Sequence, residues 1–259
     1  NDVLTANNTQ LSASIRGGNS YHVIRIDGSS GIPITESTIV DGFAVTGGNA
    51  DGDPYSTQPD ASGGGLYCDG HGHTFGNEAC NPLIENMLFY GNRAKYGAAL
   101  YNNGAYGGES RPRISNVAFE WNTAELTGGA IYNFGSNGAS SPILTGVSFE
   151  RNVATVYRGG AMYNDGRNSG SSSPLLSLVI FNNNSAGRSG GAIYSDSDDG
   201  GSTSPVLFNV TFANNVAQEG GGAMYNDAGR SGTSSPFLNE VHFLQNSVQQ
   251  GPGGAMYID

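Results

Sequence analysis

The residues between Cys68 and Cys80 are the clearest group of potential metal ligands in this sequence. Two histidines, His71 and His73, stand between the cysteines, and thiolates with imidazoles are common ligands of structural zinc. The same two cysteines could instead form a disulfide, which would stabilise the fold by about 3 kcal/mol in the chain-entropy account. Two free thiols are the third possibility. We expect the disulfide, and zinc is the alternative.

Two acidic segments have the alternating carboxylates of a calcium loop. The first contains Asp51 and Asp53, and the second contains Asp196, Asp198 and Asp199. Neither segment has the downstream glutamate that completes an EF-hand. We therefore favour solvated acidic turns and no cofactor, with Ca²⁺ binding as the alternative.

Tyrosines recur at one position of a repeated motif. The neighbouring Leu, Ile or Met is the better candidate for the interior, which would place the tyrosines outside. A column of exposed rings could hold sugar rings or a partner protein. We favour the other interpretation, in which the rings only cover a corner of the fold. The candidate contact residues are Tyr132, Tyr163, Tyr194 and Tyr225.

Acid–base catalysis has no clear signature in the sequence. A glycoside hydrolase needs two carboxylates at a defined separation, whereas Asp165, Asp196 and Asp227 recur at 31-residue steps. An acid repeated in successive units indicates a turn residue more than a single active site. We therefore favour a non-enzymatic role, with a polysaccharide lyase or glycoside hydrolase as the alternative.

The positions of all these residues depend on an internal repeat. The motif Gly-Gly-Ala-Ile/Met-Tyr begins at Gly128, Gly159, Gly190, Gly221 and Gly253, and looser copies lie upstream. Self-similarity at this period is typical of solenoids, in which each unit is stabilised by its neighbours. We expect a single continuous body with regular repeats over residues 63–259, and N-terminal rungs with an irregular insertion over residues 1–62.

A second motif alternates with the first. A proline is followed seven residues later by a phenylalanine, and each phenylalanine is followed three residues later by an asparagine. Fixed apolar positions between these points predict three short strands in each unit. Stacking would place the asparagine amides in a hydrogen-bonded ladder. The ladder residues are Asn92, Asn122, Asn152, Asn184, Asn215 and Asn246.

Composition narrows the range of partners and locations. The formal net charge of −11 argues against nucleic acid and anionic membranes as main partners. The sequence contains no run of 18 or more apolar residues, so it predicts no transmembrane helix. Abundant Gly, Asn, Ser and Thr with few lysines favours an extracellular or cell-surface location.

The Gly-Gly-Ala-Ile/Met and Phe-x-x-Asn motifs resemble the repeats of chlamydial polymorphic outer-membrane proteins. They also resemble secreted bacterial right-handed parallel β-helix repeat proteins of the choice-of-anchor type, whose opening rungs are similar to residues 20–23 and 41–50. The resemblance implies an all-β, right-handed, single-stranded parallel β-helix, with about 31 residues per coil and roughly eight coils. It also implies a surface stalk, adhesin or filament subunit, although the same fold occurs in polysaccharide-cleaving enzymes.

The expected partners are carbohydrate or a host or cell-surface protein. The sequence ends within a repeat at Asp259, without a polar cap. Unpaired strands at the end of a solenoid favour association. We therefore expect either a longer rod or head-to-tail pairing with a second copy.

Overall fold

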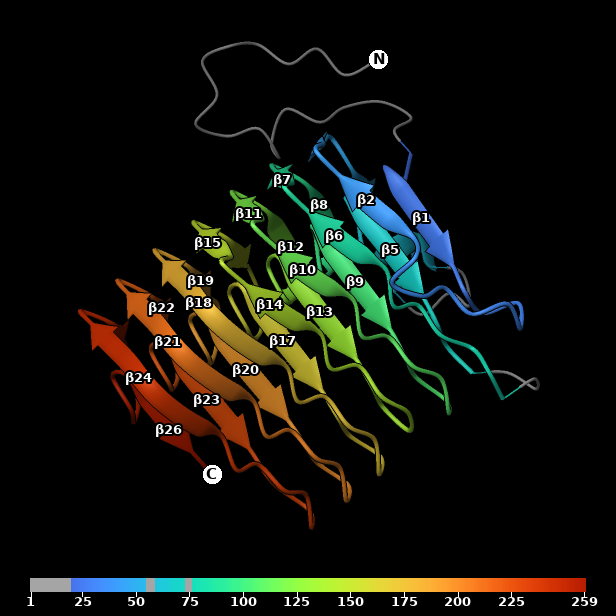
Figure 1. Ribbon diagram of the computed structural model, residues 1–259. Helices are drawn as coiled ribbons and strands as arrows, with labels where there is room; N and C mark the ends of the chain where they lie inside the picture. The colour runs from blue at the N-terminus through green and yellow to red at the C-terminus, as the bar shows by residue number, and fades with distance from the viewer. Residues whose placement is uncertain (1–19, 55–58, 73–75) are drawn as a thin grey trace.

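The computed structural model describes residues 20–54, 59–72 and 76–259 as a parallel β-solenoid. Successive coils lie side by side along one axis, from β1 at the N-terminal end to β26 at the C-terminal end (Figure 1). The described part contains no α-helix, and its one short 3-10 turn is η1 (Pro59–Ala61). The predicted fold, an all-β parallel β-helix, is confirmed.

The first sheet contains the Gly-Gly-Ala-Ile/Met-Tyr segments and their looser upstream copies, together with β1, which lacks the motif. Its strands pair in parallel and keep equivalent motif positions in register, so that Tyr132 lies opposite Tyr101 and Tyr163. The eight strands, in spatial order, are β1 (Ile24–Asp27), β5 (Leu66–Asp69), β9 (Leu100–Asn103), β13 (Ile131–Phe134), β17 (Met162–Asp165), β20 (Ile193–Asp196), β23 (Met224–Asp227) and β26 (Met256–Ile258).

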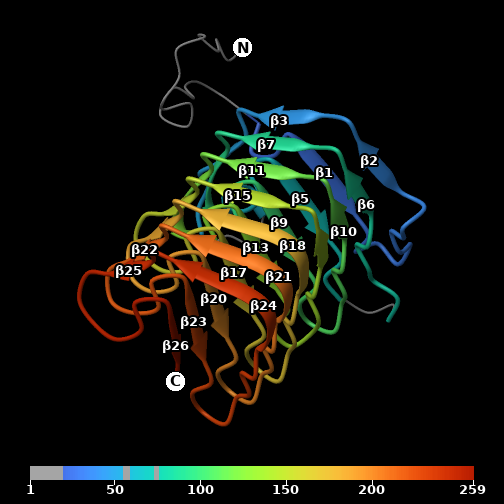
Figure 2. The same cartoon turned by 60° about the vertical axis from the view of Figure 1, so that its left-hand side comes forward.

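The second sheet contains the two strands predicted after each proline. In the early coils a bend separates two arms of short strands, while in the late coils one long strand runs through both arms (Figure 2). The first arm is β2 (Ile39–Asp41), β6 (Leu83–Glu85), β10 (Arg113–Ser115) and β14 (Ile143–Thr145). The second arm is β3 (Ala44–Thr46), β7 (Leu88–Tyr90), β11 (Ala118–Glu120) and β15 (Ser148–Glu150). The long strands are β18 (Leu175–Asn182), β21 (Val206–Ala213) and β24 (Phe237–Leu244).

A third sheet follows the asparagine ladder, where the sequence predicted only a bend. Most of its strands have two residues, and one alanine column of this sheet is buried, including Ala94, Ala124 and Ala154. The strands are β4 (Asn49–Ala50), β8 (Arg93–Tyr96), β12 (Thr123–Thr127), β16 (Val153–Ala154), β19 (Ser185–Ala186), β22 (Val216–Ala217) and β25 (Ser247–Val248).

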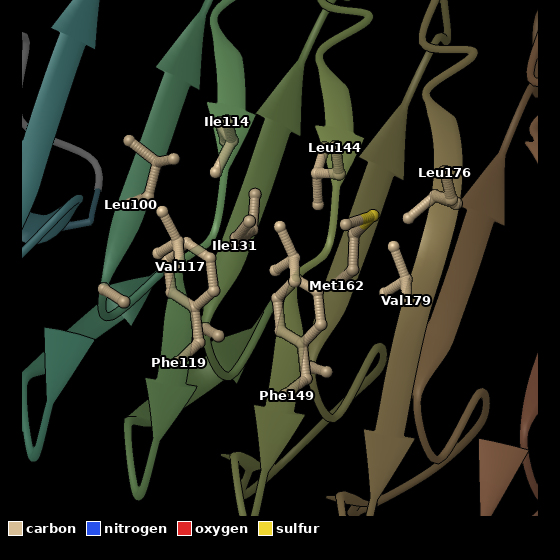
Figure 3. Packing of buried hydrophobic residues seen from close by; sticks show 14 of the residues in the cluster. Leu100, Ile114, Val117, Phe119, Ile131, Leu144, Phe149, Met162, Leu176 and Val179 are labelled. Carbon is tan, nitrogen blue, oxygen red and sulfur yellow. The ribbon is translucent and has the colours of Figure 1, made fainter. Parts of the chain in front are cut away.

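The core lies between these sheets and consists of columns of identical or similar side chains (Figure 3). The rings of Phe119 and Phe149 are parallel, with centroids 4.9 Å apart, and both side chains are fully buried. The same stacking extends from Phe89 to Phe243. Each phenylalanine therefore packs on its counterpart in the next coil, so that burial in one coil depends on the coils beside it.

The asparagines form a continuous ladder of buried amides. The Asn122 Nδ2 donates to the Asn152 Oδ1 at 3.0 Å, and the Asn152 Nδ2 donates to the Asn184 Oδ1 at 3.0 Å. From Asn122 onward each amide also donates to the backbone oxygen of a phenylalanine, as Asn152 does to Phe119 at 2.9 Å, while Asn92 donates to Val45. These bonds satisfy the polar groups at the bend that precedes the third sheet.

The number of coils differs from the expected eight. The spacing between equivalent strands is 31 to 34 residues from β5 to β26, which gives about six turns. The first two strands of this sheet, β1 and β5, begin 42 residues apart, because an irregular segment separates them. This longer first interval reduces the number of regular coils below the total length divided by 31.

Candidate functional site

Cys68 and Cys80 form a disulfide, with an S–S distance of 2.04 Å, and both residues are fully buried. The zinc alternative is wrong for these two thiols, because each sulfur is bonded to the other. The Nδ1 of His71 lies 2.8 Å from the Asp69 Oδ1, and His73 lies outside the described residues. The disulfide fixes the end of β5 beside these side chains.

Three carboxylates of the acidic segments, those of Asp51, Asp196 and Asp199, contact protein groups. Within residues 20–54, 59–72 and 76–259, no three His, Cys, Asp or Glu side chains are grouped so that they could hold a metal ion. The Asp51 carboxylate accepts from the Asn49 amide at 2.9 Å, and Asp199 lies 3.6 Å from the Arg230 guanidinium. Asp196 is buried and accepts from a tyrosine hydroxyl. Asp198 differs, because its Oδ1 is buried without a hydrogen-bond partner in the described part of the chain. Calcium binding at these segments stays a prediction.

The tyrosine column lies on the outer side of the first sheet, as expected, yet most of it is buried. The exposed fractions of Tyr132, Tyr163 and Tyr194 are 6%, 4% and 1%. Each ring stacks on its counterparts at about 5 Å, and the Arg158 guanidinium covers the Tyr194 ring at 4.7 Å. These three rings therefore form no exposed aromatic face, because stacking and covering side chains enclose them, in agreement with the favoured interpretation that they cover a corner of the fold. Tyr225 is only partly buried.

The buried hydroxyls are paired with aspartates of the next coil. The Tyr132 hydroxyl donates to the Asp165 Oδ2 at 2.7 Å, and the Tyr163 hydroxyl donates to the Asp196 Oδ2 at 2.6 Å. Burial raises the pKa of both tyrosines well above its usual value, so both remain donors. Two guanidinium nitrogens of Arg167 donate to the Asp165 carboxylate, at 3.0 and 2.7 Å. This ion pair compensates the buried negative charge of Asp165.

Burial raises the pKa of Asp196, and this shift predicts a pH dependence of stability. A raised pKa means that the folded state favours the protonated form. Protonated Asp196 contributes its full share to the free energy of unfolding at pH values below the pKa of an unfolded aspartate, which is about 3.9. This contribution is lost as pH rises through the pKa of Asp196 in the folded state. We therefore expect the wild-type chain to lose free energy of unfolding relative to Asp196→Asn as pH rises through this window. Urea titrations from pH 3 to pH 7 measure the difference, and a gap that is constant or reversed in sign would contradict the assignment.

The regular Tyr–Asp pairing is interrupted in the early coils. The position two residues after the tyrosine is Asp in β5, Asn103 in β9, Phe134 in β13 and Asp again from β17 onward. Because Phe134 stands where the acceptor of Tyr101 would be, the Tyr101 hydroxyl has no hydrogen-bond partner among the described residues. Tyr101 is nevertheless only 8% exposed.

A cavity of about 870 Å³ lies beside this interruption. It is within the range of roughly 300–1,000 Å³ that is usual for small-molecule sites. Its walls combine aromatic rings with polar and charged groups. We call it the coil-break cavity, and its main lining residues are Arg25, Asp53, Tyr67, Asp69, His71, Tyr96, Tyr101, Asn103, Tyr106, Tyr132, Phe134 and Arg167.

The polar part of the coil-break cavity is a preformed network centred on Asp69. The Asp69 Oδ1 accepts from the Asn103 Nδ2 at 3.1 Å and lies 2.8 Å from His71, and its Oδ2 lies 3.5 Å from Arg25. The Asn103 Nδ2 also donates to the Tyr67 hydroxyl at 2.9 Å. Asp69 is almost fully buried, so its orientation is fixed before any ligand arrives.

Most of this cavity was not identified from the sequence. Asp53, His71 and Tyr132 were candidates, and Tyr67 and Tyr101 occupy the repeated tyrosine position. Other lining residues, such as Arg25 and Tyr106, lie outside the repeated motif. The signal was present in one column: Asn103 and Phe134 replace the aspartate that recurs elsewhere at that position. A departure from the repeat, and not the repeat itself, marks the site.

Comparison with known proteins gives one match. Two segments, residues 178–196 and 209–227, match the Chlamydia polymorphic membrane protein (Chlamydia_PMP) repeat. No curated protein and no solved structure matches the chain. No helix of the described residues is long and apolar enough to span a membrane.

The repeat match and the parallel β-helix suggest a surface protein of the autotransporter-like type. The disulfide is consistent with an extracellular location, because disulfides persist in oxidising environments.

Proposed function

We propose that this chain is a recognition segment of a surface-displayed adhesin, with a non-enzymatic role. The observation that supports it most is the coil-break cavity on an otherwise regular solenoid. The regular coils form a stiff body in which identical side chains stack, and such a body can hold a binding site at a fixed distance from a surface. The repeat match to a polymorphic membrane protein family supports the surface location.

Adhesion of beads coated with the chain tests this role. The targets are epithelial cell monolayers and immobilised collagen, laminin and fibronectin, and beads coated with serum albumin measure the background. We expect saturable binding to at least one target above this background. If the beads bind none of these targets saturably, the adhesin role is contradicted. Head-to-tail assembly into filaments stays a prediction.

Two exposed tyrosines provide a matched pair of variants for this assay. Tyr106 lines the coil-break cavity and is 63% exposed, whereas Tyr157 is 42% exposed and lies outside the residues that line it. We expect Tyr106→Ala to reduce adhesion and Tyr157→Ala to leave it unchanged. Equal adhesion by both variants would place the contact elsewhere on the chain.

A further inference from the structure

We infer that the coil-break cavity binds a neutral pyranose ring of a carbohydrate. This inference rests on the proposed recognition role and names the ligand class. Three features carry it: a hydroxyl donor without a partner, an exposed aromatic ring at the cavity wall, and cationic side chains that are already paired with carboxylates.

The unpartnered donor is the hydroxyl of Tyr101. In neighbouring coils the equivalent hydroxyls of Tyr132 and Tyr163 donate to aspartates, but Phe134 offers no acceptor. Tyr101 lines the cavity, so a ligand oxygen there can accept a hydrogen bond from its hydroxyl and gain affinity. A sugar hydroxyl or ring oxygen provides such an acceptor, whereas an organic cation does not.

The aromatic wall fits the apolar face of a sugar ring. Tyr106 is 63% exposed and meets Phe134 edge to face, with centroids 6.3 Å apart. One face of many pyranoses presents C–H groups, which pack well on the face of an aromatic ring. The Asp69–Asn103 network then offers carboxylate and amide groups for the hydroxyls at the edge of the sugar.

The charges around the cavity disfavour an anionic ligand. Arg25 lies 3.2 Å from Asp27 and 3.5 Å from Asp69, and Arg167 is paired with Asp165. Both guanidinium groups are therefore engaged with carboxylates, and Asp53 adds a further acidic group to the lining. The carboxylate of an acidic sugar would have to compete with these aspartates for the guanidinium groups, and it would be repelled by the aspartates themselves. A neutral sugar is therefore the better fit.

Titration of the ¹⁵N-labelled chain with small ligands tests the assignment. The probes are methyl pyranosides of glucose, galactose and mannose, and N-acetylglucosamine, with choline as the cationic probe and glucuronate as the anionic probe. We expect at least one neutral sugar to shift amide signals of residues 67–72 and 101–108 saturably. Binding of choline or glucuronate alone, or of no probe, would overturn the inference.

Single-atom variants separate binding from folding. Tyr101→Phe removes a hydroxyl that makes no protein hydrogen bond, so we expect unchanged thermal stability and roughly three- to tenfold weaker binding of the sugar. The matched control, Tyr163→Phe, removes a hydroxyl bonded to Asp196, so we expect a lower melting temperature and unchanged affinity. Sugar affinity that is unaffected by Tyr101→Phe would contradict the site.

The two proposals can fail independently. Bead adhesion that survives both Tyr101→Phe and an excess of the sugars would retain the adhesin role and refute the sugar site. Sugar binding at the cavity without adhesion to any target would retain the sugar site and refute the adhesin role.

Discussion

Replacing Asn152 by alanine is expected to lower the free energy of unfolding by roughly 3 kcal/mol or more. The side chain is fully buried, and its Oδ1 accepts from both the backbone nitrogen and the Nδ2 of Asn122. Its Nδ2 donates to Phe119 and Asn184. Alanine leaves these groups without partners, and each unsatisfied buried group costs about 1–3 kcal/mol. Equilibrium unfolding in urea measures the loss.

An exposed asparagine provides the control for this prediction. Asn239 lies on the exposed side of β24, so Asn239→Ala is expected to change stability by no more than about 0.5 kcal/mol. Asn152→Asp should be at least as damaging as Asn152→Ala, because a carboxylate would direct an oxygen at the acceptors on Phe119 and Asn184. Similar small effects at positions 152 and 239 would mean that the ladder does not support the fold.

Gly160→Ala is expected to destabilise the chain by roughly 3 kcal/mol, at or above the upper end of the usual range for overpacking. A Cβ on Gly160 would lie 2.1 Å from the backbone oxygen of Gly191 in the next coil. That oxygen belongs to a paired backbone and cannot move aside as a flexible side chain would. The coils would have to separate locally, which would disturb the stacked core as well. Thermal melts followed by circular dichroism test this expectation.

The same motif position in the last coil gives a matched substitution. A Cβ on Gly254 would meet only the Asn246 oxygen, at 3.9 Å, which is an ordinary contact. We therefore expect Gly254→Ala to be tolerated, with a change in melting temperature close to zero. If both alanine variants melt at the wild-type temperature, close approach between coils is not the reason for this glycine.

The repeated residues predicted the architecture well, because each one makes the same contacts with its equivalents in the neighbouring coils. Stacked phenylalanines and buried asparagines require neighbours of the same type, so their fixed spacing directly reports the coil. The third sheet was missed because its two-residue strands carry small side chains such as Ala154 and have no strong apolar pattern. Tertiary pairing, and not local propensity, forms those strands.

The candidate site was harder to predict for the opposite reason. The residues that distinguish it depart from the repeat, as Asn103 and Phe134 do, and a departure has no spacing to recognise. The tyrosine rings were placed on the correct side of the sheet, but their burial depends on side chains from other segments, including Arg158. The repeated motif contains no information about those side chains.

Hydrogen–deuterium exchange with and without the tightest-binding methyl pyranoside tests the central claim most directly. This claim is that the regular coils support the structure while the interrupted coils bind the ligand. At saturating sugar, we predict slower exchange in peptides covering residues 67–72, 101–108 and 132–134, and no change in β20 or β23. Slower exchange confined to β20 and β23, or no change anywhere at saturation, would contradict it.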